Sequence, residues 1–117
     1  CIERWFTCRS FKKGIKLAQQ LSCIIVVTGA IDFITDGERM AYVHEGHPMM
    51  SKVTAMGCTA TGIVGAFLAV NSDPLEASFH AMKAMGIAGE RAASLSRGNG
   101  SMMINFLDEL YNLMADD

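Results

Sequence analysis

One run of small residues constrains the fold of this chain more than any other feature. Residues 52–62 read Lys-Val-Thr-Ala-Met-Gly-Cys-Thr-Ala-Thr-Gly. The beginning of the run is apolar and typical of a strand, and the small residues after it predict a turn into a helix. The first N–H groups of a helix have no partner within it, and the helix dipole is positive there. The run therefore predicts a site for an anion, such as a phosphoryl group in transfer.

Cys58 stands at the corner of this predicted turn. A helix N-terminus lowers the pKa of a cysteine thiol, so part of Cys58 is expected to be thiolate near neutral pH. A base or nucleophile beside an anion pocket is the arrangement that phosphoryl transfer requires. The alternative interpretation is structural, with Cys58 as a small buried hydrophobic residue at a tight corner.

The N-terminal part of the chain predicts a helix followed by a strand. Phe11–Leu21 places apolar residues at helical spacing between lysines and glutamines, which predicts an amphipathic helix with one buried face. Cys23–Thr28 is continuous, apolar and β-branched, a pattern typical of a strand buried on both faces of a mostly parallel sheet. Ligands bind beyond the carboxyl ends of strands in such sheets, so Thr28 occupies a position suited to a ligand contact.

A hairpin and three helices are expected to follow. Asp36-Gly37 separates Ile31–Thr35 from Arg39–His44, which is a strong hairpin signal. Helices are predicted over Cys58–Val70, from Asp73-Pro74 to about Ser96, and over Met102–Met114 with Ser101 as the cap. Glycine inside a helix costs roughly 1 kcal/mol relative to alanine, so the glycines of the first helix predict a close approach of its backbone to the sheet. The predicted inward residues are Leu75, Phe79, Met82, Met85, Ala88, Ala92 and Leu95, then Ile104, Leu107, Leu110 and Tyr111.

Composition excludes several classes of protein. A net charge of −2 and a pI near 5.9 give no electrostatic basis for binding nucleic acid. The longest apolar runs, Cys23–Val27 and Ile63–Val70, are too short to span a bilayer, so no membrane partner is expected. The four cysteines show neither C-x-x-C nor zinc spacing, which indicates reduced thiols and a cytoplasmic location. Residues 1–10, including Trp5, match no pattern and are treated as an unassigned leader.

The sequence lacks the motifs of several other kinds of enzyme and binding site. The chain has no phosphate-binding G-x-x-x-x-G-K-[ST] run, no dinucleotide fingerprint and no G-x-S-x-G nucleophile. His44 and His47 invite a metal interpretation, but no third ligand lies near them in sequence and no helix is expected through Pro48. A thiol redox protein is the weakest alternative because no resolving cysteine lies near Cys58.

Several blocks of the chain resemble the hydroxyethylthiazole kinases of the ribokinase-like superfamily. Val53–Gly62, with Gly46–Met50 upstream, is similar to that family's signature. Further blocks follow the family's order at Ile25–Gly29, Ile31–Gly37, Ala88–Ala92 and Gly98–Ser101. The resemblance implies an α/β, ribokinase-like three-layer fold that is only partial. Residues 11–117 would form its C-terminal half as one unit, a short, mostly parallel sheet with a hairpin, packed by helices.

The resemblance also implies a reaction. Members of the family use ATP and Mg²⁺ to phosphorylate the primary hydroxyl of 4-methyl-5-(2-hydroxyethyl)thiazole, and their active sites lie between subunits of a homotrimer. By resemblance, Cys58 is the general base, where the wider superfamily usually has aspartate. The same resemblance implies that Thr28, Met56 and Gly57 would bind the ATP phosphates and that Ala55 would offer its N–H to the substrate. No metal ligand is assigned in this chain.

The chain departs from the family pattern at three positions. The motif commonly reads Gly-Thr-Gly-Cys, whereas here Ala55 and Met56 replace its first two residues. Alanine does not take positive φ cheaply. Ala30 stands where relatives often carry an acidic residue that would contact nucleotide or metal. Family members are longer, so the alternative to a kinase is a truncated, non-catalytic fragment that binds nucleotide weakly or only self-associates.

Overall fold

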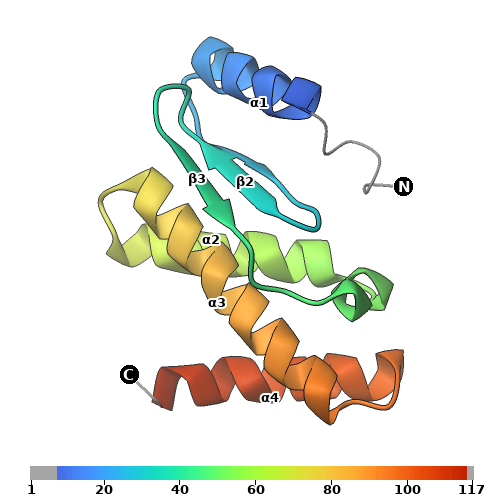
Figure 1. Cartoon of the computed structure of the whole chain (residues 1–117). Coiled ribbons are helices and arrows are strands. Elements are labelled where there is room, and N and C mark those ends of the chain that lie inside the picture. The colour runs from blue at the N-terminus through green and yellow to red at the C-terminus, as the bar shows by residue number, and fades with distance from the viewer. Residues whose placement is uncertain (1–7, 116–117) are drawn as a thin grey trace.

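The computed structural model describes residues 8–115 of the chain (Figure 1). Within this range the elements, in order, are α1 (Cys8–Leu21), β1 (Ile25–Val27), β2 (Asp32–Thr35), β3 (Met40–Val43), the 3₁₀ helix η2 (Pro48–Lys52), α2 (Met56–Val70), α3 (Pro74–Leu95) and α4 (Asn99–Ala115). Most of the predicted leader, with Trp5, lies outside the described residues. The α/β class is confirmed, and α1 begins at Cys8 rather than at Phe11.

The sheet is antiparallel, so the prediction of a mostly parallel sheet is wrong. Its order is β1-β2-β3, with Ile25 opposite Thr35 and Asp32 opposite Val43. Parallel neighbours need a crossover of a dozen or more residues, and both connections here are short turns. The predicted hairpin around Asp36-Gly37 is confirmed as β2 and β3. β1 is at one edge of this sheet and is only half-buried, so its apolar run did not indicate parallel pairing.

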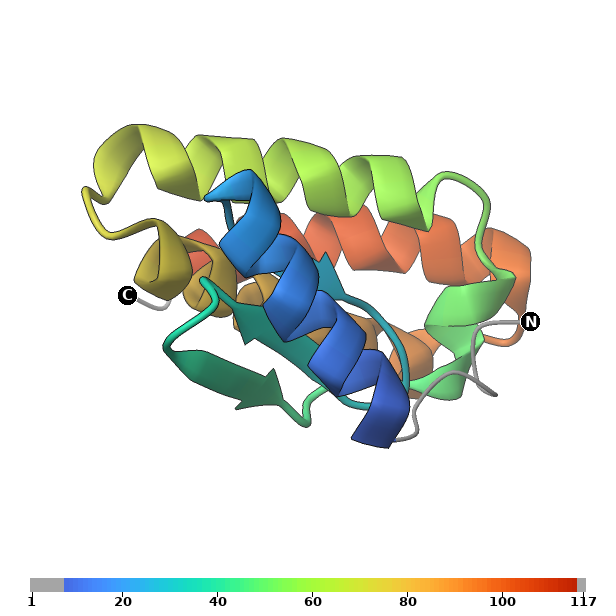
Figure 2. The same cartoon turned by 90° about the horizontal axis from the view of Figure 1, so that it is seen from above.

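Helices cover both faces of the sheet. α1 lies over one face, as the view from above shows (Figure 2), and α3 packs against the other. Phe11 of α1 contacts Phe33 of β2 with ring centroids 4.7 Å apart and Tyr42 of β3 at 5.9 Å. The amphipathic helix predicted from the lysine-rich pattern is thereby confirmed, and Phe33 is fully buried beneath it.

α3 is the central helix of the other layer. Asp73 caps it by accepting the N–H groups of Leu75 and Glu76, and Pro74 is its first residue, as predicted. Most of the predicted inward residues are buried, namely Leu75, Met82, Met85, Ala88 and Ala92. The prediction that Leu95 faces inward is wrong, because this side chain is 62% exposed in the last turn of the helix. α2 and α4 both pack on α3.

The inward face of α4 differs from the prediction. Met102 and Phe106 are buried, whereas Ile104, Leu107 and Tyr111 are 61, 57 and 76% exposed. The helix begins at Asn99, so Ser101 lies inside it and does not cap it. Two apolar stripes run along α4, and helical spacing alone does not indicate which of them faces α3.

α2 also packs differently from the prediction. It packs on α3 rather than on the sheet, and its Ile63 and Val64 are half-buried against the hydrophobic core. Its glycines, Gly57, Gly62 and Gly65, have no atom of another residue within 4 Å of where a Cβ would lie, beyond their own helix turn and chain neighbours. The predicted close backbone approach is therefore wrong. Within residues 8–115, no helix is long and apolar enough to cross a membrane.

Arg39 ties the hairpin to the start of α3 and makes stability sensitive to acid. Its guanidinium binds Asp73 at 2.9 and 3.0 Å and Asp36 at 2.9 Å. Backbone N–H groups and Arg39 lower the pKa of Asp36 to about 2, and Arg39 lowers the pKa of Asp73. Because both carboxyl groups have a lower pKa in the folded state than the ordinary 3.8, their ionised forms stabilise the fold above that pH. This stabilisation is lost as the pH falls from the ordinary pKa through the pKa of the folded state.

We expect the melting temperature to fall between about pH 4 and pH 2, and Arg39→Gln to weaken this dependence. These groups are exposed, so the effect is modest. Thermal unfolding followed by circular dichroism at a series of pH values measures it. Arg97→Gln, which removes another exposed guanidinium, is the control. Identical pH dependence in wild type and Arg39→Gln would contradict the assignment.

Candidate functional site

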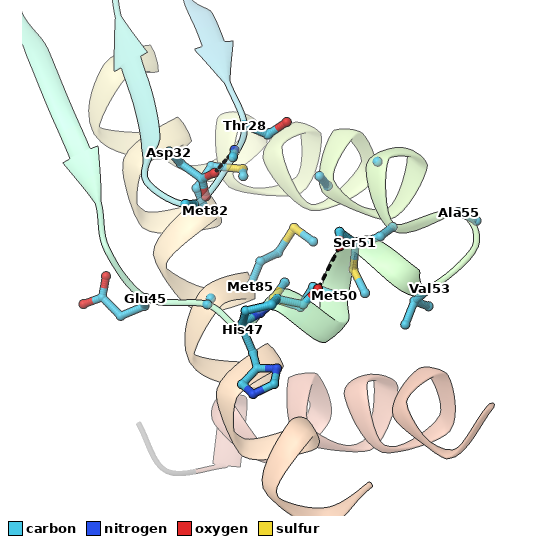
Figure 3. A pocket seen from close by; sticks show the side chains of 18 residues that line it. Thr28, Asp32, Glu45, His47, Met50, Ser51, Val53, Ala55, Met82 and Met85 are labelled. Carbon is cyan, nitrogen blue, oxygen red and sulfur yellow. Dashed lines mark hydrogen bonds between the residues drawn. The ribbon is translucent and has the colours of Figure 1, made fainter. Parts of the chain in front are cut away.

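A pocket of about 470 Å³ opens beyond the ends of the sheet strands (Figure 3). Four parts of the chain line it: the turn after β1, residues 45–51 after β3, the first turn of α2 and the middle of α3. Its size lies within the range of small-molecule sites. Its position beyond the end of β1 agrees with the expectation drawn from the strand that ends at Thr28.

The turn after β1 presents Thr28 to the pocket and is held by Asp32. Thr28 is exposed and lines the pocket. The Gly29 N–H donates to Oδ1 of Asp32 at 3.0 Å, which closes the turn before β2. Burial raises the pKa of Asp32, although the hydrogen bond from Gly29 opposes the shift. Asp32 is not among the site residues predicted from the sequence. The sequence offers no signal for this bond, because it runs back to the N–H three residues earlier, whereas an Asx turn bonds to the backbone two residues further on.

The first turn of α2 forms the opposite wall. The lead-in to this helix is not a strand, so that prediction is wrong. His47 accepts the Met49 N–H on Nδ1 at 3.1 Å and Pro48 follows, which starts the 3₁₀ helix η2 instead. A bend at Val53 and a turn at Thr54-Ala55 then lead into α2.

Ala55 takes the left-handed backbone conformation, with φ 67° and ψ 15°, and makes no side-chain cap. The first hydrogen bond of the helix runs from the Thr59 N–H to the Ala55 carbonyl at 3.0 Å. The N–H groups of Met56, Gly57 and Cys58 therefore precede the intrahelical ladder and can donate to an anion.

The pocket brings together four of the five predicted site residues. Thr28, Ala55, Met56 and Gly57 all line it. Cys58 follows directly on the first turn of α2, but it is not among the lining residues and its thiol is free and exposed. The alternative interpretation of Cys58 as a buried hydrophobic residue is therefore wrong. Its role as a base stays a prediction.

Methionines give the pocket an apolar surface that was not predicted from the sequence. Met82 and Met85 come from α3, Met50 from η2 and Met56 from α2, and all four line the pocket. Figure 3 shows Met50 and Met85 in its centre. Met82 and Met85 were predicted as core residues, and they are buried as well as pocket-lining. Methionine sulfur packs well against aromatic rings, so this surface suits a flat heterocycle.

The two histidines that raised a metal interpretation do not form a cluster. His47 uses Nδ1 to cap η2, and Figure 3 shows its ring turned away from the pocket. Across the part of the chain that the structure describes, no three His, Cys, Asp or Glu side chains are placed to share a metal ion.

The strained turn at Ala55 predicts a stabilising substitution. A non-glycine residue in the left-handed region costs roughly 1–2 kcal/mol, and glycine takes it freely. We expect Ala55→Gly to increase the free energy of unfolding by about 1 kcal/mol. Chemical denaturation measures it. Ala60→Gly, within the same helix, is the matched control and should lower stability by about 1 kcal/mol. An equal decrease in the free energy of unfolding for both variants would show that the backbone at Ala55 is not strained.

The chain is similar in sequence to known hydroxyethylthiazole kinases. The sequence profile of the hydroxyethylthiazole kinase family matches residues 9–116. The chain is 50% identical over 97 residues to the hydroxyethylthiazole kinase of Granulibacter bethesdensis, covering 83% of this chain and 35% of that protein. It is 45% identical over 102 residues to the enzyme of that name from Moorella thermoacetica, covering 87% and 38%.

A solved structure agrees with the sequence matches. The structure of hydroxyethylthiazole kinase protein from Pyrococcus horikoshii OT3 superposes with a TM-score of 0.85 at 35% identity. It covers 89% of this chain, and the chain covers 41% of it. The chain thus spans less than half the length of these relatives. With the profile match over nearly its whole length, the chain belongs to the hydroxyethylthiazole kinase family.

Proposed function

We propose that this chain carries the phosphoryl-transfer corner of a hydroxyethylthiazole kinase, with residues 11–117 as its C-terminal part. The substrates are ATP and the primary hydroxyl of 4-methyl-5-(2-hydroxyethyl)thiazole. One observation carries the proposal: the Thr28 turn and the first turn of α2 line a single pocket in a chain of this family.

The roles follow from the chemistry of phosphoryl transfer. The N–H groups at the start of α2 and the Thr28 hydroxyl donate to phosphate oxygens and stabilise the charge that develops on them. The Cys58 thiolate takes the proton of the substrate hydroxyl as the new O–P bond forms, and the bond between the γ-phosphorus and ADP breaks. Cys58 is adjacent to these donors along the helix, which supports this role. The methionine surface packs the heterocycle.

The donor set fits the phosphates of ATP better than it fits Mg²⁺. Asp32 and Glu45 are the carboxylate side chains that line the pocket, and Ala30, which also lines it, offers no third carboxylate. Mg²⁺ commonly binds through one or two carboxylates together with substrate phosphates and water. Mg²⁺ would supply charge neutralisation on the phosphates, and the described residues contribute the backbone donors and the base.

We also propose that the chain self-associates through an exposed face of α4. Ile104, Leu107 and Tyr111 form an exposed apolar stripe on α4, which suits contact with another protein surface. The trimer implied by the family resemblance gives this stripe an occupant, a second copy of the chain. A cytoplasmic location is proposed on the same resemblance.

A coupled assay of ADP release tests the proposal. The chain is incubated with ATP and Mg²⁺, with and without the hydroxyethylthiazole. We expect ADP release that depends on the thiazole and saturates with it. Release that is independent of the thiazole, or no release at all, would contradict the kinase proposal.

The second candidate is a non-catalytic fragment that binds nucleotide or only self-associates. One observation favours it: Ala30 lines the pocket at the position where the family resemblance implies an acidic residue, so the pocket has no carboxylate there. A rise in melting temperature with ATP but no thiazole-dependent turnover would identify a nucleotide-binding remnant. If ATP neither raises the melting temperature nor is turned over, a molecular mass that rises with concentration in ultracentrifugation would identify a chain that only self-associates.

A further inference from the structure

The pocket wall formed by residues 45–51 is attached to α3 through its first residues. The Gly46 N–H donates to Oε1 of Glu90 at 2.9 Å. The Glu45 carboxylate lies 3.8 Å from Nζ of Lys83. Gly86 lies against the backbone of Glu45, so close that a Cβ at this position would overlap the Glu45 carbonyl group. These contacts join the wall to one helix over an interval of 44 residues in sequence.

The three α3 residues share one face of the helix. Lys83, Gly86 and Glu90 are spaced three and four residues apart, so they align along one side of α3. The adjacent face carries Met82 and Met85, which line the pocket. α3 therefore supplies both the floor of the pocket and the attachment of its wall.

Glu90 makes a polar contact with the wall that the function described so far does not use. Gly46 has φ 144°, a conformation that favours glycine, and its N–H is directed to a charged acceptor. Hydrogen bonds to ionised groups are stronger than neutral ones. Loss of the carboxylate would remove this charged acceptor and leave the wall held by the Glu45 contacts and by the packing of η2 against α3 and α4.

We propose that Glu90 is a positioning residue: through Gly46 it holds residues 45–51 in the conformation that completes the pocket. A wall that is in place only part of the time reduces the apparent affinity of the pocket by the fraction in place. The chemistry after binding is unaffected, because Glu90 does not line the pocket. This inference rests on the proposed function for its kinetic readout but not for its structural one.

The test compares Glu90→Ala with Glu90→Gln, which keeps an oxygen acceptor for the Gly46 N–H. We expect Glu90→Ala to raise the KM for the hydroxyethylthiazole about fivefold, the factor that corresponds to about 1 kcal/mol. The kcat should stay within about twofold. Hydrogen exchange by NMR should show faster exchange of the Gly46 amide. Glu90→Gln should have a KM and a Gly46 exchange rate close to those of the wild type. Glu76→Ala, on the exposed side of α3, should leave both the KM and the exchange rate unchanged.

Three results would overturn the proposal. They are an unchanged Gly46 exchange rate in Glu90→Ala, a Glu90→Gln variant as impaired as Glu90→Ala, and a loss in kcat with KM unchanged. If the wild-type chain shows no turnover, the proposed function fails. The exchange rates of Gly46 in the two variants then still decide whether Glu90 holds the wall.

Discussion

Gly86→Ala should destabilise the chain by about 2 kcal/mol, because overpacking at a rigid contact costs roughly 1–3 kcal/mol. A Cβ at this position would lie 2.7 Å from the carbonyl carbon of Glu45 and 2.8 Å from its Cβ, and nearer still to its carbonyl oxygen. These are backbone or near-backbone atoms, so the strand-to-wall connection must move as a unit. Urea denaturation measures the loss, and the same displacement of the wall should weaken ligand binding.

Two other glycines serve as matched controls. Gly89→Ala would overlap the Met50 side chain, most closely its Sδ, with Cε at 2.9 Å and Cγ at 3.0 Å, but this flexible side chain can rotate away. Its effect on stability should be small. Gly65→Ala has no neighbour within 4 Å and should gain about 1 kcal/mol from helix propensity. A Gly86→Ala variant as stable as Gly65→Ala would show that the Glu45 contact is not rigid.

Cys58→Ala should lower kcat about 100-fold in the thiazole-dependent reaction, the size of effect typical for loss of a general base. Activity should not vanish, because the α2 N–H groups and the Thr28 hydroxyl still position and neutralise the phosphates. Steady-state kinetics across pH measures the effect. Cys58→Asp should keep more activity than Cys58→Ala, and its activity should extend to lower pH because aspartate deprotonates well below cysteine.

Cys23→Ser is the control for this experiment. Cys23 is the other free cysteine among the residues whose side chains the structure describes, and it does not line the pocket. Its replacement should leave kcat unchanged. A Cys58→Ala variant with the kcat of wild type would remove Cys58 from the catalytic role and leave the helix N-terminus as the main element of the site.

The local parts of the fold were predictable from the sequence because their causes are local. Asp73 and Pro74 specify where α3 begins, and Asp36-Gly37 specifies the hairpin turn. The pocket-lining positions of Thr28 and Gly57 followed from a strand end and a helix start. In each case a few adjacent residues determine the backbone.

The errors share a different origin, since they depend on contacts between distant segments. The apolar run that ends at Thr28 suits a parallel or an antiparallel neighbour, and only its partner strand decides which. α4 has two apolar stripes, and its packing on α3 buries Met102 and exposes Leu107. Glu90 meets Gly46 across 44 residues, a pairing that helical periodicity does not predict.

A titration of the ¹⁵N-labelled chain with ATP and Mg²⁺, followed by amide NMR, tests the central claim most directly. A chain of 12.7 kDa is well suited to this measurement. The claim predicts that the largest shifts occur at the amides of Thr28, Met56, Gly57 and Cys58, where phosphate oxygens would meet the turn and the helix N-terminus. Absence of shifts, or shifts confined to α1 and α4, would show that this pocket does not hold the phosphates of ATP.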